Sequence, residues 1–324
     1  PVVDDPGEPA LPLFNLFFEA GMLDRSFCAL AALLLMNAAD DTERRAYAGL
    51  LRFVPQGPAR PLTDALWRER LLHPYCRGEL ATLASVVFRG APQLFDGRQR
   101  ALGLRPRKER VDLADTRKNA PAKLRFFDVW RRLQKVLHVP AAEHYLRAGS
   151  ADAPRLCPGP QPILFAGRQH EIFSTASSRS IAWTLGRQMA VSRPELALAA
   201  ALDPEDVAAC LEAALRLVAP EGSGVDLGQR SEEVAGWQKL LGRHLSERAR
   251  GALREPALLV VENRRMKVLA RYLRGVEHSA NRVALLASGD VGAAIAGLDD
   301  TEPLVPDVSR SEEHTSELQS HAPI

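Results

Sequence analysis

The spacing of apolar residues constrains this chain most strongly. In residues 181–191, which read IAWTLGRQMAV, apolar side chains recur at Ile181, Leu185 and Met189, about one helical turn apart. Ala, Leu, Arg and Glu are abundant and only 6% of residues are aromatic, a composition that favours helices. The sequence therefore predicts a mainly α fold built from helical hairpins.

The N-terminal part resembles a helical repeat. Segments 13–23 and 27–39 form a predicted hairpin around a turn near Asp24, and a third helix follows with Asp40 or Asp41 as its N-cap. Short helices with Ala and Gly at packing points are similar to a tetratricopeptide-type unit. Because the chain begins with Pro1 rather than Met, we expect a fragment of a longer protein.

Later segments mix one β element with further helices. The apolar run ILFA (163–166) predicts a short strand, and EIFS (171–174) allows a second, which gives a small β element near 160–175. The organisation we expect is a repeat-like helical part (1–95), a basic linker (96–118), a helical domain (119–298), a tail (299–309) and a non-native end (310–324).

The last fifteen residues of the chain resemble a translated sequencing adapter rather than natural protein sequence. A back-translation of RSEEHTSELQSH, which begins at Arg310, gives the string of a common short-read sequencing adapter. Residues 310–324 therefore resemble translated adapter, and His314 and His321 are left out of every functional argument.

Charge gives little support for a nucleic-acid partner. The chain has 42 Lys and Arg residues against 40 Asp and Glu, a net charge of +2. The segment from Arg98 to Lys135 is markedly basic, but acidic residues interleave with the basic ones, and Phe126, Phe127 and Trp130 have helical spacing. We expect a solvated helix face with an aromatic core side. A nucleic-acid surface is the alternative.

No membrane span, cofactor site or disulfide framework is predicted. The longest apolar run, residues 27–36, is too short to cross a bilayer. The cysteines (Cys28, Cys76, Cys157 and Cys210) form no CxxC pair, which favours packing thiols in a reducing, cytoplasmic compartment. Phosphate-cradling and nucleophile-elbow motifs are absent from the sequence.

The order of elements resembles a metallopeptidase family. A short strand is followed by the helix with Arg187 and Gln188, and a distant helix carries EHSANR (277–282) and then LLASGD (285–290). This order is similar to the gluzincins of the HtpX and CaaX-prenyl-protease type. In them an L-G-H-E-x-x-H helix supplies two zinc-binding His and a general-base Glu. A later E-x-x-A-D-R helix supplies the third ligand.

The resemblance implies a site without its catalytic groups. Aligned on Leu185-Gly186, Arg187 stands at the first His, Gln188 at the base and Val191 at the second His. Glu277 matches the third ligand, and Asn281 replaces the supporting Asp. Catalytic zinc needs three protein ligands, but Val191 cannot ligate, Arg187 repels the ion, and Gln188 cannot take a proton. We therefore expect no metal, and an ion pair between Arg187 and Glu277.

The function expected from this resemblance is non-catalytic binding of other proteins. The chain would be the C-terminal part of a large bacterial tetratricopeptide protein, ending in an inactivated peptidase-like scaffold. The alternative is an active zinc hydrolase that uses Glu277 with His278 or His170. HEIFS, which begins at His170, starts like H-E-x-x-H but has Ser174 in place of the second His.

Overall fold

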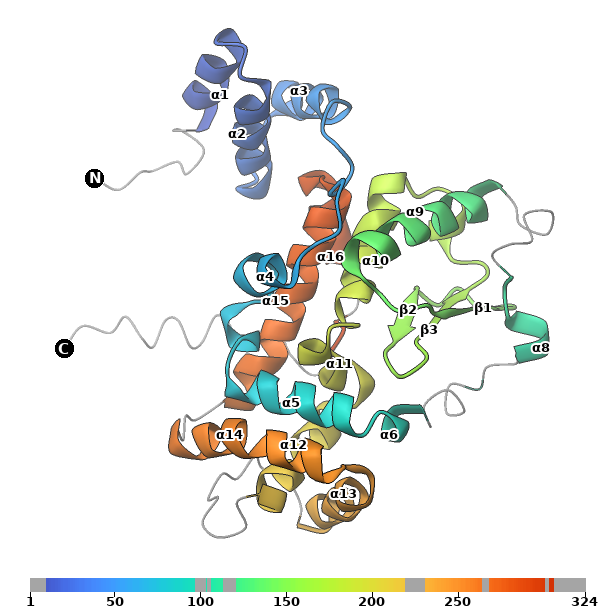
Figure 1. Ribbon diagram of the computed structural model, residues 1–324. Helices are drawn as coiled ribbons and strands as arrows, with labels where there is room; N and C mark the ends of the chain where they lie inside the picture. The colour runs from blue at the N-terminus through green and yellow to red at the C-terminus, as the bar shows by residue number, and fades with distance from the viewer. Residues whose placement is uncertain are drawn as a thin grey trace.

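The computed structural model describes residues 10–96, 103, 106–112, 121–218, 231–263, 268–300 and 303–305. These residues are mainly helical with one small sheet, which confirms the expected fold class (Figure 1). The end at 310–324 and most of the basic linker at 96–118 lie outside them.

Three helices form a separate N-terminal unit: α1 (Ala10–Glu19), α2 (Leu23–Leu35) and α3 (Asp41–Leu51). Asp40 is the N-cap of α3 in a reciprocal capping box. Its Oδ1 accepts from the Glu43 backbone N–H at 2.7 Å, and its own N–H donates to Glu43 Oε2 at 2.6 Å. The first turn ends at Met22 rather than near Asp24, because Gly21 adopts the left-handed φ of 70° that such a turn requires.

The rest of the chain forms one larger body. Its N-terminal segments are α4 (Asp64–Leu66), a π-helical turn η1 (Trp67–Leu71), a 3-10 turn η2 (Pro74–Cys76), α5 (Glu79–Gly90), α6 (Gln93–Asp96), α8 (Pro106–Glu109) and α9 (Pro121–Leu137). After the sheet come η4 (Glu171–Phe173), α10 (Ser178–Ala190), α11 (Pro194–Ala201), α12 (Pro204–Val218), α13 (Ser231–His244), α14 (Glu247–Asn263), α15 (Val268–Ser288) and α16 (Val291–Asp300).

The sheet has three strands in the order β1–β3–β2: β1 (Glu143–Arg147), β2 (Arg155–Cys157) and β3 (Ile163–Gly167). β1 runs parallel to β3, and β2 runs antiparallel to it. The predicted strand at 163–166 is confirmed as the central strand. A strand at 171–174 is wrong, since these residues form the 3-10 turn η4. The other two strands precede the expected 160–175 range.

Side chains alternate across β3, as a pleated strand requires. Ile163 and Phe165 pack with Tyr145 and Cys157 on one face. Leu164 and Ala166 join the main core on the other face, where the buried rings of Phe126, Phe127 and Trp130 from α9 also pack. The expected core role of these three aromatic residues is therefore confirmed.

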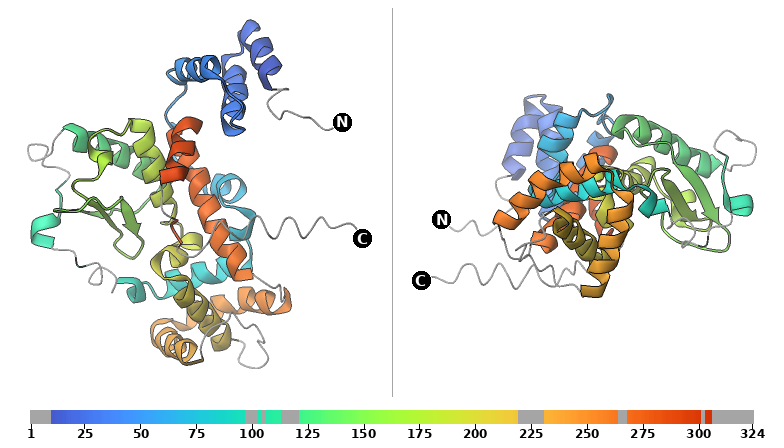
Figure 2. Two further views of the ribbon diagram at one scale, coloured as in Figure 1. Left: turned by 180° about the vertical axis from the view of Figure 1, so that it is seen from behind. Right: turned by 60° about the horizontal axis from the view of Figure 1, so that its bottom comes forward.

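Two buried cores divide the molecule at a different place from the expected boundary. The smaller core holds Leu30, Leu33 and Tyr47 with Val291 of α16. The main core begins at Leu62 and runs through to the C-terminal segment. Residue 95 therefore does not separate two cores. Seen from behind (Figure 2), the sheet lies on one flank, and α12–α14 gather at the end opposite α1–α3.

Candidate functional site

Helix α10 carries the residues aligned with the peptidase motif, and it lies deep in the protein. Ser177 is its N-cap, since its hydroxyl accepts from the Ser180 backbone N–H at 3.0 Å. Nearly every side chain from Ile181 to Ala190 is buried. The helix packs against α9 on one side and α15 on another.

Arg187 forms the expected ion pair with Glu277 across the α10–α15 contact. Its Nη2 lies 2.6 Å from Glu277 Oε2, and the two side chains are only 5% and 13% exposed. Its Nε donates to Asn281 Oδ1 at 2.9 Å. Glu277 and Asn281 are one helical turn apart on α15, so both face the same guanidinium.

The second carboxylate oxygen of Glu277 also accepts a hydrogen bond. The backbone N–H of Val305 donates to Glu277 Oε1 at 2.9 Å, and the Val305 side chain is fully buried in the main core. The segment 303–305 therefore returns to α15 and covers the site. Residues 303–305 of the expected tail (299–309) therefore pack as part of the fold.

Gln188 points to the sheet and not to Glu277. Its Oε1 accepts from the backbone N–H of Leu156 in β2 at 3.0 Å. This bond satisfies a buried amide and fixes the edge strand to α10. No sequence signal pointed to this role, because the strand it serves is only three residues long.

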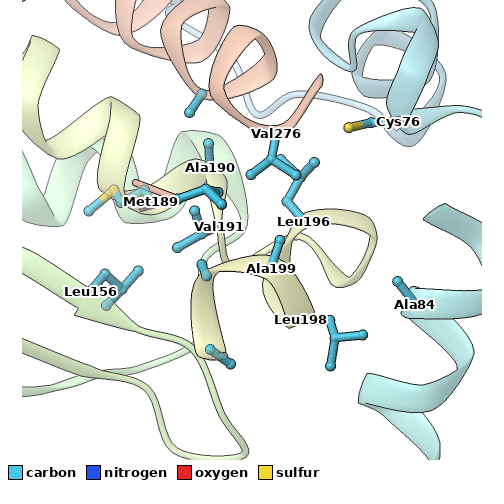
Figure 3. Close-up of a cluster of buried hydrophobic side chains, with 14 of the residues drawn as sticks. Cys76, Ala84, Leu156, Met189, Ala190, Val191, Leu196, Leu198, Ala199 and Val276 are labelled. Carbon is cyan, nitrogen blue, oxygen red and sulfur yellow. The ribbon is translucent and has the colours of Figure 1, made fainter. Parts of the chain in front are cut away.

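Val191 belongs to the hydrophobic core. It is fully buried, and Figure 3 shows its side chain among those of Leu156, Met189 and Leu196. The five expected site residues therefore separate into two groups. Arg187, Glu277 and Asn281 form one polar network, whereas Gln188 and Val191 contact other elements.

The chemistry open to this network is structural. One buried cation, one carboxylate and one amide bond each other, and the carboxylate also binds a backbone N–H. No cluster of three or more His, Cys, Asp or Glu side chains that could hold a metal ion is found in the part of the chain that the structure describes.

The alternative ligand set is not brought together by the fold. His170 is the N-cap of η4, and its Nδ1 accepts from the Ile172 backbone N–H at 3.1 Å. The ring of His278 packs beside that of His73, with centroids 4.9 Å apart. Glu277 is instead held by Arg187.

Arg179 joins the N-terminal unit to the main body, a role the sequence analysis missed. Its Nη2 donates to the carbonyls of Leu51 and Val54 at 2.8 and 2.6 Å. Its Nη1 donates to the carbonyls of Ser288 and Gly289 at 2.8 and 3.3 Å. One guanidinium thereby satisfies carbonyls at the C-terminal ends of α3 and α15.

Tyr47 makes a second link between the two cores. Its hydroxyl donates to Asp290 Oδ1 at 3.0 Å and accepts from the Val291 backbone N–H at 2.8 Å. Burial and the charge of Asp290 raise the pKa of Tyr47 to about 12, so the phenol stays protonated at neutral pH.

Two described arginines of the 98–135 region form ion pairs with acidic side chains. Arg110 lies 2.9 Å from Glu143, and Arg131 lies 3.4 Å from Asp128. Other basic residues of this segment, including Arg98, Arg100, Arg105, Arg117 and Lys118, lie outside the described residues.

No protein-family model matches this chain, and no curated protein or solved structure matches it significantly. Among the described helices, none combines the length and apolar character needed to span a bilayer. All four cysteines are free thiols, three of them buried.

Proposed function

We propose that this chain binds other proteins through its N-terminal helices and is not an enzyme. The observation that supports protein binding most directly is the apolar surface of α1. Its sequence, ALPLFNLFFE, is apolar nearly all round, and helices of this kind are normally covered on all sides. Among the described helices α2 is the main neighbour of α1, and Leu13, Leu16 and Phe18 remain 45%, 60% and 52% exposed.

The exposed apolar surface extends beyond α1. Leu35 at the end of α2 is 62% exposed, and Phe53 after α3 is 65% exposed. Of the fifteen large apolar side chains that are exposed among the described residues, eight lie between Leu13 and Phe53. This concentration on one small unit marks an interaction surface rather than scattered surface residues.

The partner we propose presents an apolar helical surface. Helical hairpins in repeat arrays bury such faces against the helices of their neighbours. The unit also projects from the main body, so its outer face is open to a partner (Figure 1). The resemblance to tetratricopeptide proteins supports this assignment, with the chain as the C-terminal part of a bacterial, cytoplasmic scaffold.

The main body contributes a scaffold in this proposal. The resemblance to gluzincin peptidases supports a pseudopeptidase domain, in which Arg187 and Glu277 form an ion pair where that family holds zinc. A buried guanidinium repels a metal cation at this position. Protein binding by α1–α3 and the pseudopeptidase assignment of the main body rest on different residues, so each can be tested without the other.

Site-specific photocrosslinking tests the binding surface. A benzoylphenylalanine at Leu16 is expected to give discrete adducts with other proteins in lysate of the source organism. Phe18→Ser should remove these adducts, since it makes the centre of the face polar. The matched control is the same photocrosslinker at Leu285 of α15, which is 38% exposed. Equal adducts at both positions, or adducts only between copies of this chain, would contradict the proposal.

A further inference from the structure

A second group of polar side chains lies on α15, outside the network around Arg187. His278 and Arg282 are one helical turn apart. The segment around η2 places His73 and Arg77 beside this helix, and the ring centroids of His73 and His278 are 4.9 Å apart. These four residues are called the His–Arg cluster below.

The two guanidinium groups of the cluster converge on one oxygen atom. Arg77 Nε donates to the Leu72 carbonyl at 2.9 Å, and Arg282 Nη1 donates to the same carbonyl at 3.4 Å. Arg77 Nη2 also donates to the Glu69 carbonyl at 2.8 Å. Each guanidinium has five N–H groups, so several remain without a partner among the described residues.

The segment that carries His73 is fixed tightly to α15. The His73 backbone N–H donates to Ser279 Oγ at 2.9 Å, and Ser279 Oγ donates to the Gly275 carbonyl at 2.6 Å. A Cβ at Gly275 would lie 2.8 Å from Cys76 Sγ, so only glycine allows this approach. Figure 3 shows Cys76 beside the part of α15 that carries Val276. The backbone that carries His73 is therefore held in a fixed position against α15.

The cluster presents donors and positive charge. His73 Nδ1 accepts from the Tyr75 backbone N–H at 3.3 Å, so the neutral ring carries its proton on Nε2. Burial, followed by the charges of His278, Arg282 and Arg77, lowers the pKa of His73 to about 4. Within the described ranges, no acidic side chain forms an ion pair with any of the four residues.

We propose that the His–Arg cluster is a binding site for a phosphoryl dianion. Two guanidinium groups match two negative charges and offer the forked N–H geometry that phosphate oxygens accept. The His73 Nε2–H adds a neutral donor at the edge of the site. A small phosphate ester and a phosphorylated protein side chain share this chemistry. The proposal does not depend on protein binding by α1–α3, because it uses other residues on another element.

The first test uses inorganic phosphate as the probe and the full chain as the protein. Imidazole NMR signals are followed at pH 7 while sodium chloride keeps the ionic strength constant. Saturable shifts of His73 and His278 are expected.

A matched control distinguishes phosphate binding at the His–Arg cluster from nonspecific electrostatic attraction. Arg282→Gln should weaken phosphate binding about tenfold, because it removes one charge-assisted contact. Arg271→Gln makes the same charge change on the same helix, about 16 Å away, and should leave affinity within about twofold. Thermal unfolding of both variants verifies that they fold.

A second arm identifies the source of the phosphoryl group. A short phosphoserine peptide is compared with its unphosphorylated form and with inorganic phosphate. Tighter binding of the phosphopeptide supports a phosphorylated protein as the ligand, and equal binding supports a small phosphate. The absence of a saturable response to either phosphoryl probe, or equal losses in the Arg271 and Arg282 variants, would overturn the site.

Discussion

Arg187 carries a permanent charge into a nearly water-free part of the core. Such a charge is tolerated only when it is paired and hydrogen-bonded, and Glu277 and Asn281 supply both requirements. A buried pair of this kind adds little net stability over an apolar pair of similar size. Removing one partner is costly, because the other charge is left buried without compensation.

Glu277→Ala is therefore expected to lower the free energy of unfolding by about 3–5 kcal/mol. The double variant Arg187→Met/Glu277→Leu should recover most of that loss, because no unpaired charge remains. Urea unfolding of the three proteins measures both effects.

Asp128→Ala is the control for this prediction. It breaks an exposed pair with Arg131 and should change stability by less than about 1 kcal/mol. If Glu277→Ala costs no more than Asp128→Ala, the Arg187–Glu277 pair is not a structural element of the core.

At the scale of elements, the contact between α10 and α15 depends on Gly186. A Cβ at this position would lie 2.7 Å from the Ala287 Cβ and 3.0 Å from the Ala284 Cα. The backbones of the two helices thus approach more closely than any larger residue allows. This approach brings Arg187, the next residue, within reach of Glu277 on the neighbouring helix.

Gly186→Ala is expected to destabilise the protein by about 1–3 kcal/mol, because the added methyl group forces the two helices apart. Gly236→Ala in α13 is the matched control, since no atom lies within 4 Å of its added Cβ. Alanine there should stabilise the helix by about 0.5–1 kcal/mol. Thermal unfolding should therefore show shifts of opposite sign, and a stabilised Gly186→Ala protein would contradict the packing argument.

Some elements are strongly encoded in local sequence and others are not. The capping residues Asp40 and Ser177 and the apolar strand at 163–166 carry clear local signals. β1 reads EHYLR and β2 only RLC, too short and too polar for a strand pattern. Helix α14 continues through Pro256, a residue that normally ends a helix, so its length is not encoded in local sequence.

Only some contacts of the candidate site could be predicted from the sequence. The pair of Arg187 and Glu277 was expected because their charges are opposite and a family pattern aligned their helices. Gln188 and Arg179 could not be assigned, because their partners are backbone groups of distant segments. Such contacts depend on the tertiary arrangement and leave no mark on residue spacing.

At the scale of the whole molecule, the N-terminal helices are joined to the main body by apolar packing of α16 on α2 and by a few polar links. Arg179 bonds four backbone carbonyls from both parts, and Tyr47 bonds Asp290 at the start of α16. α10 and α15 form the centre of the main body (Figure 1). The Arg187–Glu277 ion pair joins these two helices. A buried ion pair therefore lies at the contact between the two central helices.

Metal content tests this central claim most directly. The purified chain is dialysed against zinc and then against metal-free buffer, and zinc per chain is measured by mass spectrometry. We expect zinc close to zero, because the buried Arg187 guanidinium would repel a cation at the position that the family resemblance assigns to zinc. About one zinc per chain, released by a chelator together with a peptidase activity, would contradict it.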